Sequence, residues 1–135
     1  MAHANNQQEN NNIQEIKYFR EMLAHCTYNS SIVLDLDNTI LEPTEELGSD
    51  QWFEELRHYI SSKDNSVNVN ELALTLYYAI QQHVHAQATE QNIKKIINAL
   101  QYIGLPVIGL TARGAPILDA TVRQLVEIAL IFLRE

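Results

Sequence analysis

Apolar residues follow two spacing patterns along the chain, and together these predict a mixed α/β fold. Two short, continuous apolar runs predict strands that are covered on both faces, at Ile32–Leu34 and in "PVIGLT" from Pro106 to Thr111. Apolar positions three and four residues apart instead predict amphipathic helices. These helices are expected over about Asn12–Cys26, from Ser49 or Asp50 to Ile60, over Glu71–Gln87, from Thr89 to Ile103, and from Pro116 onward.

The order of these elements predicts how they connect. Strands that are joined through helices form parallel sheets with right-handed crossovers, so the two strands should lie side by side and point the same way. Two helices separated by the polar loop Ser61–Asn70 fall between the strands, and we expect them to form a small helical cap insertion at about residues 44–88. The apolar run Ile128–Leu133 fits either the end of the last helix or the start of another strand.

The first twelve residues differ in composition from the rest. MAHANNQQENNN predicts a disordered Asn/Gln-rich tail at 1–12, which leaves 13–135 as one domain. The tail has neither the basic start nor the apolar centre of a secretion signal, and no apolar run approaches the roughly 20 residues of a membrane span. The single cysteine, Cys26, fits a reducing compartment. A cytoplasmic location is therefore expected.

Charge narrows the choice of partner. The chain has 17 acidic and 9 basic residues and a formal net charge of −8. A nucleic-acid backbone or an anionic membrane is a poor partner for such a surface. A small phosphorylated ligand is still compatible, because a bound cation reverses the local field.

Polar clusters follow both predicted strands at the point where each strand ends. Asp35-Leu36-Asp37-Asn38-Thr39 follows the first, and Thr111-Ala112-Arg113-Gly114 follows the second. Ligands of parallel sheets bind at the carboxyl ends of the strands. If the first strand continues that far, Asp35 and Asp37 point to the same side and offer two hard oxygen donors, half of a Mg²⁺ site.

These residue types suit phosphoryl transfer. An aspartate can act as a covalent nucleophile, and a second carboxylate beside it is well placed for general acid and base catalysis. Thr111 and the backbone N–H groups of the "ARG" turn can hold phosphate oxygens. Other residues have simpler interpretations: Asp50 is a helix cap, and His83 and His85 are surface histidines. Trp52 and Phe53 are assigned to cap core, with lining of the substrate mouth as the alternative.

The two clusters resemble a known superfamily. "IVLDLDNT" resembles the first motif of the haloacid dehalogenase-like (HAD) hydrolases, and "VIGLT" resembles their second. "LGSDQWF" and "LTARG" are similar to a bacterial subgroup, the DUF2608 proteins of intracellular pathogens and their relatives. A few of these look like secreted effector phosphatases that act on phosphotyrosine. The resemblance implies a HAD-like Rossmannoid parallel sheet, with delivery into a host cell if this chain is an effector.

Carried over by position, the resemblance also implies roles. Asp35 is the nucleophile that accepts the phosphoryl group, and Asp37 is the general acid and base. The two together hold Mg²⁺, with the backbone carbonyl of Asp37 contributing. Thr39 braces the loop and is assigned with Thr111 to phosphate binding. The expected substrate is a phosphorylated small molecule or phosphoprotein.

Ala112 and Arg113 complete the expected phosphate-binding turn. Arg113 lies outside the superfamily's invariant residues, and we assign it to substrate charge because it is the only basic residue close to either cluster.

The pattern departs from the superfamily after Thr111. Neither the third motif, a Lys or Arg, nor the fourth, an acidic pair that completes the Mg²⁺ site, follows it. We therefore expect the N-terminal half of a Mg²⁺-dependent phosphatase, part of a longer protein. The first strand would then keep an open edge, which favours self-association.

Two alternatives stay open at this point. One is a truncated, non-catalytic interaction module or remnant. The other is a metal-dependent glycosyltransferase that uses Asp-x-Asp to hold the metal of a nucleotide sugar.

Overall fold

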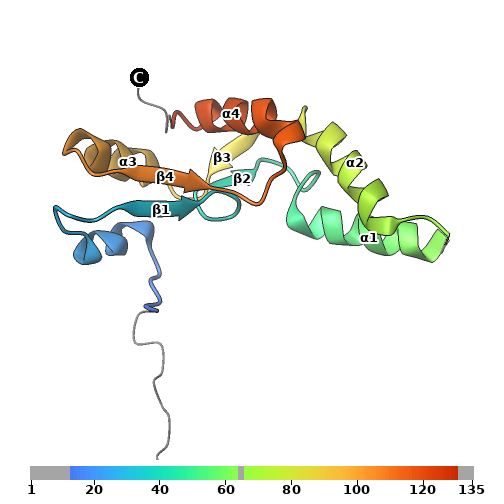
Figure 1. Cartoon of the computed structure of the whole chain (residues 1–135), viewed down its shortest axis with the longest axis horizontal. Coiled ribbons are helices and arrows are strands. Elements are labelled where there is room, and N and C mark those ends of the chain that lie inside the picture. The colour runs from blue at the N-terminus through green and yellow to red at the C-terminus, as the bar shows by residue number, and fades with distance from the viewer. Residues whose placement is uncertain (1–12, 64–65, 131–135) are drawn as a thin grey trace, which may run out of the picture.

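The computed structural model describes residues 13–63 and 66–130, so the expected tail at 1–12 lies outside the described residues. The chain forms short 3₁₀ helices, α-helices and two pairs of strands (Figure 1). In chain order the elements are η1 (Phe19–His25), β1 (Ile32–Asp35), β2 (Leu41–Pro43), α1 (Asp50–Lys63), α2 (Val69–Gln81), β3 (Ala86–Ala88), α3 (Ile93–Tyr102), β4 (Val107–Leu110), η2 (Ala115–Ile117) and α4 (Leu118–Glu127).

The two predicted strands form a parallel pair. β1 pairs with β4 in the register Ile32↔Val107 to Asp35↔Leu110. Both strands point toward the α1–α2 helix pair, which stands beyond their carboxyl ends (Figure 1). The mixed α/β class and the helical insertion between the strands are thus as the sequence indicated.

One face of this sheet forms the core. Ile32, Leu34 and Val107 are buried, and they belong to one apolar cluster with residues of α3. The α3 residues of the cluster are Ile93, Ile97 and Leu100. α3 ends as its sequence predicts: Gly104 has φ +87°, and the N–H of Leu105 donates to the carbonyl of Leu100 at 3.0 Å.

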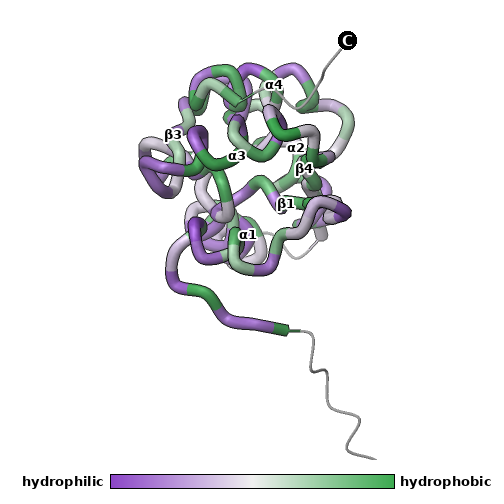
Figure 2. The backbone as a smooth tube through the Cα atoms, turned by 90° about the vertical axis from the view of Figure 1, so that its left-hand side faces the viewer, coloured by the Kyte–Doolittle hydropathy of each residue, from purple (hydrophilic) through white to green (hydrophobic). Residues whose placement is uncertain are grey.

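The other face of the sheet is exposed, which contradicts the expectation of strands covered on both faces. Val33, Ile108 and Leu110 keep 57%, 52% and 60% of their surface accessible. Figure 2 shows the tube at β1 and β4 largely in the hydrophobic colour. A continuous apolar run cannot say how many layers cover it, because that depends on which helices pack there. Within the described residues, β4 is the only strand that pairs with β1, and self-association stays a prediction.

An antiparallel pair was not predicted. β2 pairs with β3 in the register Leu41↔Ala88 to Pro43↔Ala86. The expected helix Glu71–Gln87 is wrong at both ends: α2 begins earlier, at Val69 with Asn68 as its cap, and ends at Gln81. Strand β3 forms at Ala86–Ala88 instead because contacts with distant parts of the chain stabilise it. Besides pairing with β2, the N–H of Ala86 donates to the Glu127 carboxylate at 2.9 Å.

The expected helix over Asn12–Cys26 is also wrong. Only the short 3₁₀ helix η1 forms there, and Phe19 is its one buried residue. Ile13, Ile16 and Leu23 are exposed. Amphipathic helices gain most of their stability from packing, and only Phe19 of this stripe is buried in the core.

The last helix ends before the ambiguous apolar run. Ala129 has φ +57°, and the N–H of Leu130 donates to the carbonyl of Leu125 at 2.9 Å, which closes α4. Leu130 is buried, and the rest of the run lies outside the described residues. None of the helices within 13–63 and 66–130 is long and apolar enough to cross a membrane.

Candidate active site

The two polar clusters meet where β1 and β4 end. Asp35 is the last residue of β1, and the N–H of Leu36 donates to the carbonyl of Leu110, the last residue of β4, at 2.9 Å. This bond holds the loop after β1 beside the turn after β4. The structure therefore brings together two segments about 75 residues apart.

A tight loop after β1 turns the polar side chains outward. The carbonyl of Leu36 accepts hydrogen bonds from the N–H groups of Ile40 and Leu41 at 3.1 Å, and these three side chains are buried. Asn38 has φ +57°, the left-handed conformation that such a loop requires and that asparagine tolerates. The strand ends at Asp35 rather than running on to Asp37, so loop geometry, not strand alternation, positions the second acid.

Asp35 stands exposed at the tip of its strand. Its Oδ2 accepts a hydrogen bond from the Thr39 hydroxyl at 2.9 Å. The loop thus folds back so that Thr39 holds the orientation of this carboxylate. This contact agrees with the expectation that Thr39 braces the loop.

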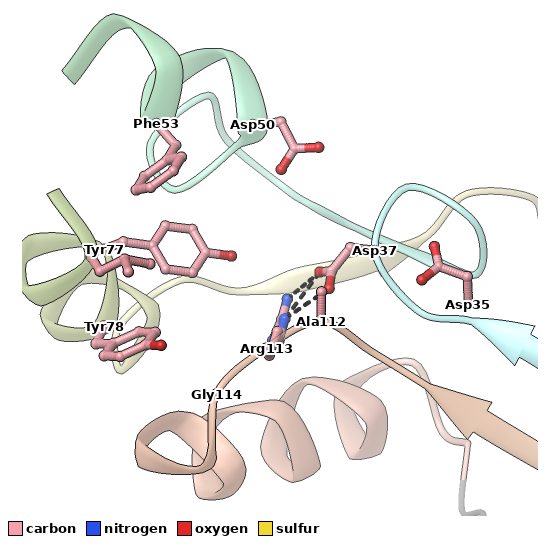
Figure 3. Close-up of a pocket in the computed structure, with 10 residues that line it drawn as sticks. Asp35, Asp37, Asp50, Phe53, Tyr77, Tyr78, Ala112, Arg113 and Gly114 are labelled. Carbon is pink, nitrogen blue, oxygen red and sulfur yellow. Dashed lines mark hydrogen bonds and ion pairs between the residues drawn. The ribbon is translucent and has the colours of Figure 1, made fainter. Parts of the chain in front are cut away.

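Asp37 is held by the second cluster. Nη2 of Arg113 donates to Oδ1 at 2.6 Å, and Nε lies 3.0 and 3.1 Å from the two oxygens. The Thr111 hydroxyl adds a third donor group at 3.2 Å. Figure 3 shows the carboxylate of Asp37 facing Arg113, with Asp35 to one side of the pair. Arg113, assigned to substrate charge, is therefore bonded to an acid of this chain.

A buried polar chain continues from Arg113 to the base of the cap. Its Nη1 donates to Oε1 of Gln124 at 2.6 Å, and Nε2 of Gln124 donates to Oε1 of Gln81 at 3.0 Å. Nε2 of Gln81 then donates to the carbonyl of Gly48, just before α1, at 2.8 Å. Both glutamines are 1% exposed. Sequence reasoning did not find this pair, because glutamines on amphipathic helices ordinarily face water.

The clusters open onto a pocket of about 350 Å³. The strand ends contribute one side, formed by Asp35, Asp37, Ala112, Arg113 and Gly114. The cap helices contribute the other, formed by Asp50, Phe53, Leu74, Tyr77 and Tyr78 (Figure 3). Four of the predicted site residues thus line the pocket, and the other two, Thr39 and Thr111, bond the two carboxylates.

Of the aromatic wall, Tyr77 and Tyr78 were not predicted as part of the site, whereas lining of the substrate mouth was the alternative for Phe53. Phe53, assigned to cap core, contacts the Tyr77 ring edge-on, and Tyr77 contacts Tyr78. Asp50 starts α1, and its Oδ2 accepts a hydrogen bond from Asn38 at 2.6 Å, so it also ties the cap to the loop. The adjacent pair Tyr77-Tyr78 was the one signal available, but only the packing of α2 shows where it points.

Tyr78 sits against the turn after β4. A Cβ placed on Gly114 would lie 2.5 Å from the Tyr78 hydroxyl oxygen. Glycine is needed here for this close approach rather than for its backbone conformation, since φ is −73°.

The electrostatic setting of Tyr77 reflects both sides of the pocket. Burial raises the pKa of its hydroxyl above 10.0, the nearby Arg113 acts in the opposite direction, and the negative charges of Asp37 and Asp50 raise it further. The Tyr77 hydroxyl therefore lies close enough to both acids to feel their charge.

Mg²⁺ binds oxygen ligands, so the acidic residues near the pocket determine whether this ion fits here. Across the described parts of the chain, no group of three His, Cys, Asp or Glu residues could hold a metal. His83 and His85 are exposed, as expected. Asp35 offers a carboxylate, whereas Asp37 is engaged by Arg113. Mg²⁺ commonly uses one or two protein carboxylates, and Asp35 is a ligand of that type, but the described residues place no group of three such ligands around it.

Comparison with known proteins gives one family. The family described as "Protein of unknown function (DUF2608)" matches residues 11–135, so the chain belongs to it. No curated protein and no solved structure matched the chain.

Proposed function

We propose that this DUF2608 chain forms part of a Mg²⁺-dependent phosphatase of the HAD-like type, in which Asp35 accepts the phosphoryl group. One observation carries the proposal. An exposed aspartate, fixed by a neighbouring hydroxyl, stands at the carboxyl end of a parallel strand and lines a pocket with the turn after the adjacent strand. Ligands of parallel sheets bind at the carboxyl ends of the strands, where this carboxylate stands.

We assign the first chemical step to Asp35, and its contact with Thr39 supports this assignment. The Thr39 hydroxyl bonds Oδ2, which fixes the plane of the carboxylate and leaves Oδ1 as the attacking oxygen. Attack on phosphorus forms the acyl-phosphate bond and breaks the bond to the ester oxygen, which departs with the alcohol. Water then hydrolyses the acyl phosphate and restores Asp35.

Asp37 is assigned the proton transfers. It would give a proton to the leaving oxygen and later take one from the attacking water. Arg113 and Thr111 hold its orientation through their hydrogen bonds, so we now assign both a positioning role toward Asp37. Proton transfer depends on such fixed geometry.

A magnesium ion would be held by the Asp35 carboxylate and the backbone carbonyl of Asp37. When bound, it would neutralise phosphate charge in a pocket that three aspartates and one arginine line.

The test is hydrolysis of para-nitrophenyl phosphate by the 135-residue chain with Mg²⁺. Asp35→Asn should lower kcat at least about a thousandfold while the circular dichroism spectrum is unchanged. Asp119→Asn, which changes an exposed aspartate on α4, is the matched control and should keep full activity. Equal turnover by Asp35→Asn and the unaltered chain would remove the mechanism.

A non-catalytic interaction module is the second candidate. Two observations favour it: the described residues hold no three-ligand metal group, and Arg113 is committed to Asp37. Absence of both turnover and Mg²⁺ binding by calorimetry would select this candidate. Turnover of a nucleotide sugar, with none of a phosphate ester, would instead select the glycosyltransferase.

A further inference from the structure

The cap side of the pocket carries three aromatic rings set at large angles to one another. The Phe53 and Tyr77 centroids are 5.3 Å apart with an interplanar angle of 67°, and those of Tyr77 and Tyr78 are 6.2 Å apart at 58°. Rings inclined in this way form a curved surface rather than a flat stack (Figure 3). Curved aromatic surfaces suit compact cations, which are attracted to ring faces within about 6 Å of the centroid.

The charge of the pocket points the same way. Asp35, Asp37 and Asp50 line it, and Arg113 is the only basic residue among the lining side chains. The Arg113 side chain is 5% exposed and is already paired with Asp37, so its positive charge is largely balanced within the protein. The pocket is therefore acidic toward anything that enters it.

Asp50 supplies the charge next to the rings. It lies one turn before Phe53 on α1, it is exposed, and its bond from Asn38 fixes one oxygen. Its negative charge contributes to raising the pKa of the Tyr77 hydroxyl, so the Asp50 carboxylate acts electrostatically on the aromatic wall. Asp35 lies on the opposite side of the pocket, at the strand ends (Figure 3).

The volume limits the size of the occupant. At about 350 Å³ the pocket is near the lower end of the range for small-molecule sites, which is roughly 300–1,000 Å³. It suits a compact organic cation together with a phosphate group.

We propose that the pocket takes a phosphate monoester of a small amino alcohol. The ammonium group lies against Phe53, Tyr77 and Tyr78, with Asp50 as its counter-charge, and the phosphate faces Asp35. The phosphate end rests on the function proposed above, whereas the ammonium end does not depend on it. A phosphate ester with an uncharged aryl group would also contact the rings. It would bring no positive charge to pair with the Asp50 carboxylate beside them.

The first experiment uses choline, which has the cation but no phosphate. Titration of the intact chain, followed by NMR, should show saturable binding. The neutral isostere 3,3-dimethyl-1-butanol should bind about tenfold more weakly, because only the charge differs. Equal binding of the two compounds, or no binding of choline, would overturn the proposal.

Variants locate the site. Asp50→Asn and Tyr77→Ala should each weaken choline binding by about tenfold. Glu55→Gln, an exposed acid on the same helix, is the matched control and should bind choline as the unaltered chain does. The capping side chain of α1 is Ser49, whose hydroxyl accepts a hydrogen bond from the Trp52 N–H, so Asp50→Asn leaves the cap in place and remains informative if Tyr77→Ala fails to fold. Unchanged binding in Asp50→Asn would place the cation elsewhere and refute the assignment.

The two proposals fail separately. Asp35→Asn should keep choline binding and lose phosphatase activity. Choline binding without any hydrolysis would contradict the phosphatase and leave the cation site standing. Hydrolysis of para-nitrophenyl phosphate with no preference for phosphocholine over 3,3-dimethylbutyl phosphate would leave the phosphatase standing and contradict the substrate class.

Discussion

The guanidinium of Arg113 and the carboxylate of Asp37 meet side-on, with Nη2 2.6 Å and Nε 3.0 Å from the same oxygen. One residue follows β4 and the other follows β1, so this pair joins the two strand ends that form the pocket. Arg113 also reaches Gln124, and through it the base of the cap. The site and the cap therefore share one hydrogen-bonded network.

Arg113→Lys should destabilise the protein although the charge is kept. Arginine bonds Asp37 through one edge of its guanidinium and Gln124 through the other nitrogen, whereas lysine has a single ammonium group that cannot do both. One of these acceptors is therefore left without its partner. We expect the free energy of unfolding in urea to fall by about 1–3 kcal/mol. Arg57→Lys, a half-buried arginine of α1 that bonds Glu54 and Asn70, is the control and should change it less. Equal effects of the two substitutions would show that the network adds no stability.

The glutamine pair offers a double-mutant test. Gln124→Leu removes the acceptor of Arg113 and the donor to Gln81, and should cost about 1–3 kcal/mol. Adding Gln81→Leu should cost less than its effect alone, because the two glutamines are each other's partners. Chemical denaturation of the two single variants and the double variant measures the coupling. Strict additivity would mean that the two side chains act independently.

Gly114→Ala should disturb the contact between the cap and the turn after β4. The new methyl group would lie 2.5 Å from the Tyr78 hydroxyl oxygen, so the tyrosine must move. We expect a loss of about 1–3 kcal/mol in unfolding free energy, as for other overpacked sites.

Tyr78→Phe provides the control for this contact. Without the hydroxyl, the nearest ring atom lies 3.2 Å from the new methyl group, so the double variant should recover part of the stability. If Gly114→Ala is equally destabilising with Phe at position 78, the close approach is not the cause.

Glu127 should make stability depend on pH below about 4.5. Burial acts to raise its pKa, but the hydrogen bonds from the Ala86 N–H, His85 and Arg123 outweigh burial and hold the pKa below 4.5. Because the folded pKa is depressed, the stabilisation is complete above the unfolded value and is lost as pH falls through the folded one.

Urea unfolding at a series of pH values tests this. Glu127→Gln should be less stable than the unaltered chain at pH 6, and the difference should shrink as the pH is lowered below about 4.5. A difference that stays constant down to pH 3 would contradict the assignment.

Local sequence determined where the strands of the parallel pair lie and where helix α3 ends. The strands Ile32–Leu34 and Val107–Leu110 are continuous apolar runs, and Gly104 ends α3 because it takes a left-handed conformation at little cost. Parallel pairing of these strands followed from the helices between them, and it placed Asp35 and Thr111 at one edge of the sheet.

Long-range packing decided the rest. Nothing local indicates that only Phe19 of the apolar stripe before Cys26 is buried, that Ala86–Ala88 pairs with β2, or that one face of the sheet is exposed. The bonding of Arg113 to Asp37, and the convergence of Phe53, Tyr77 and Tyr78, likewise depend on where α2 and α4 settle. Residue types and spacing fix which groups are available, but burial and partners are properties of the whole fold, and these determine what each group can do.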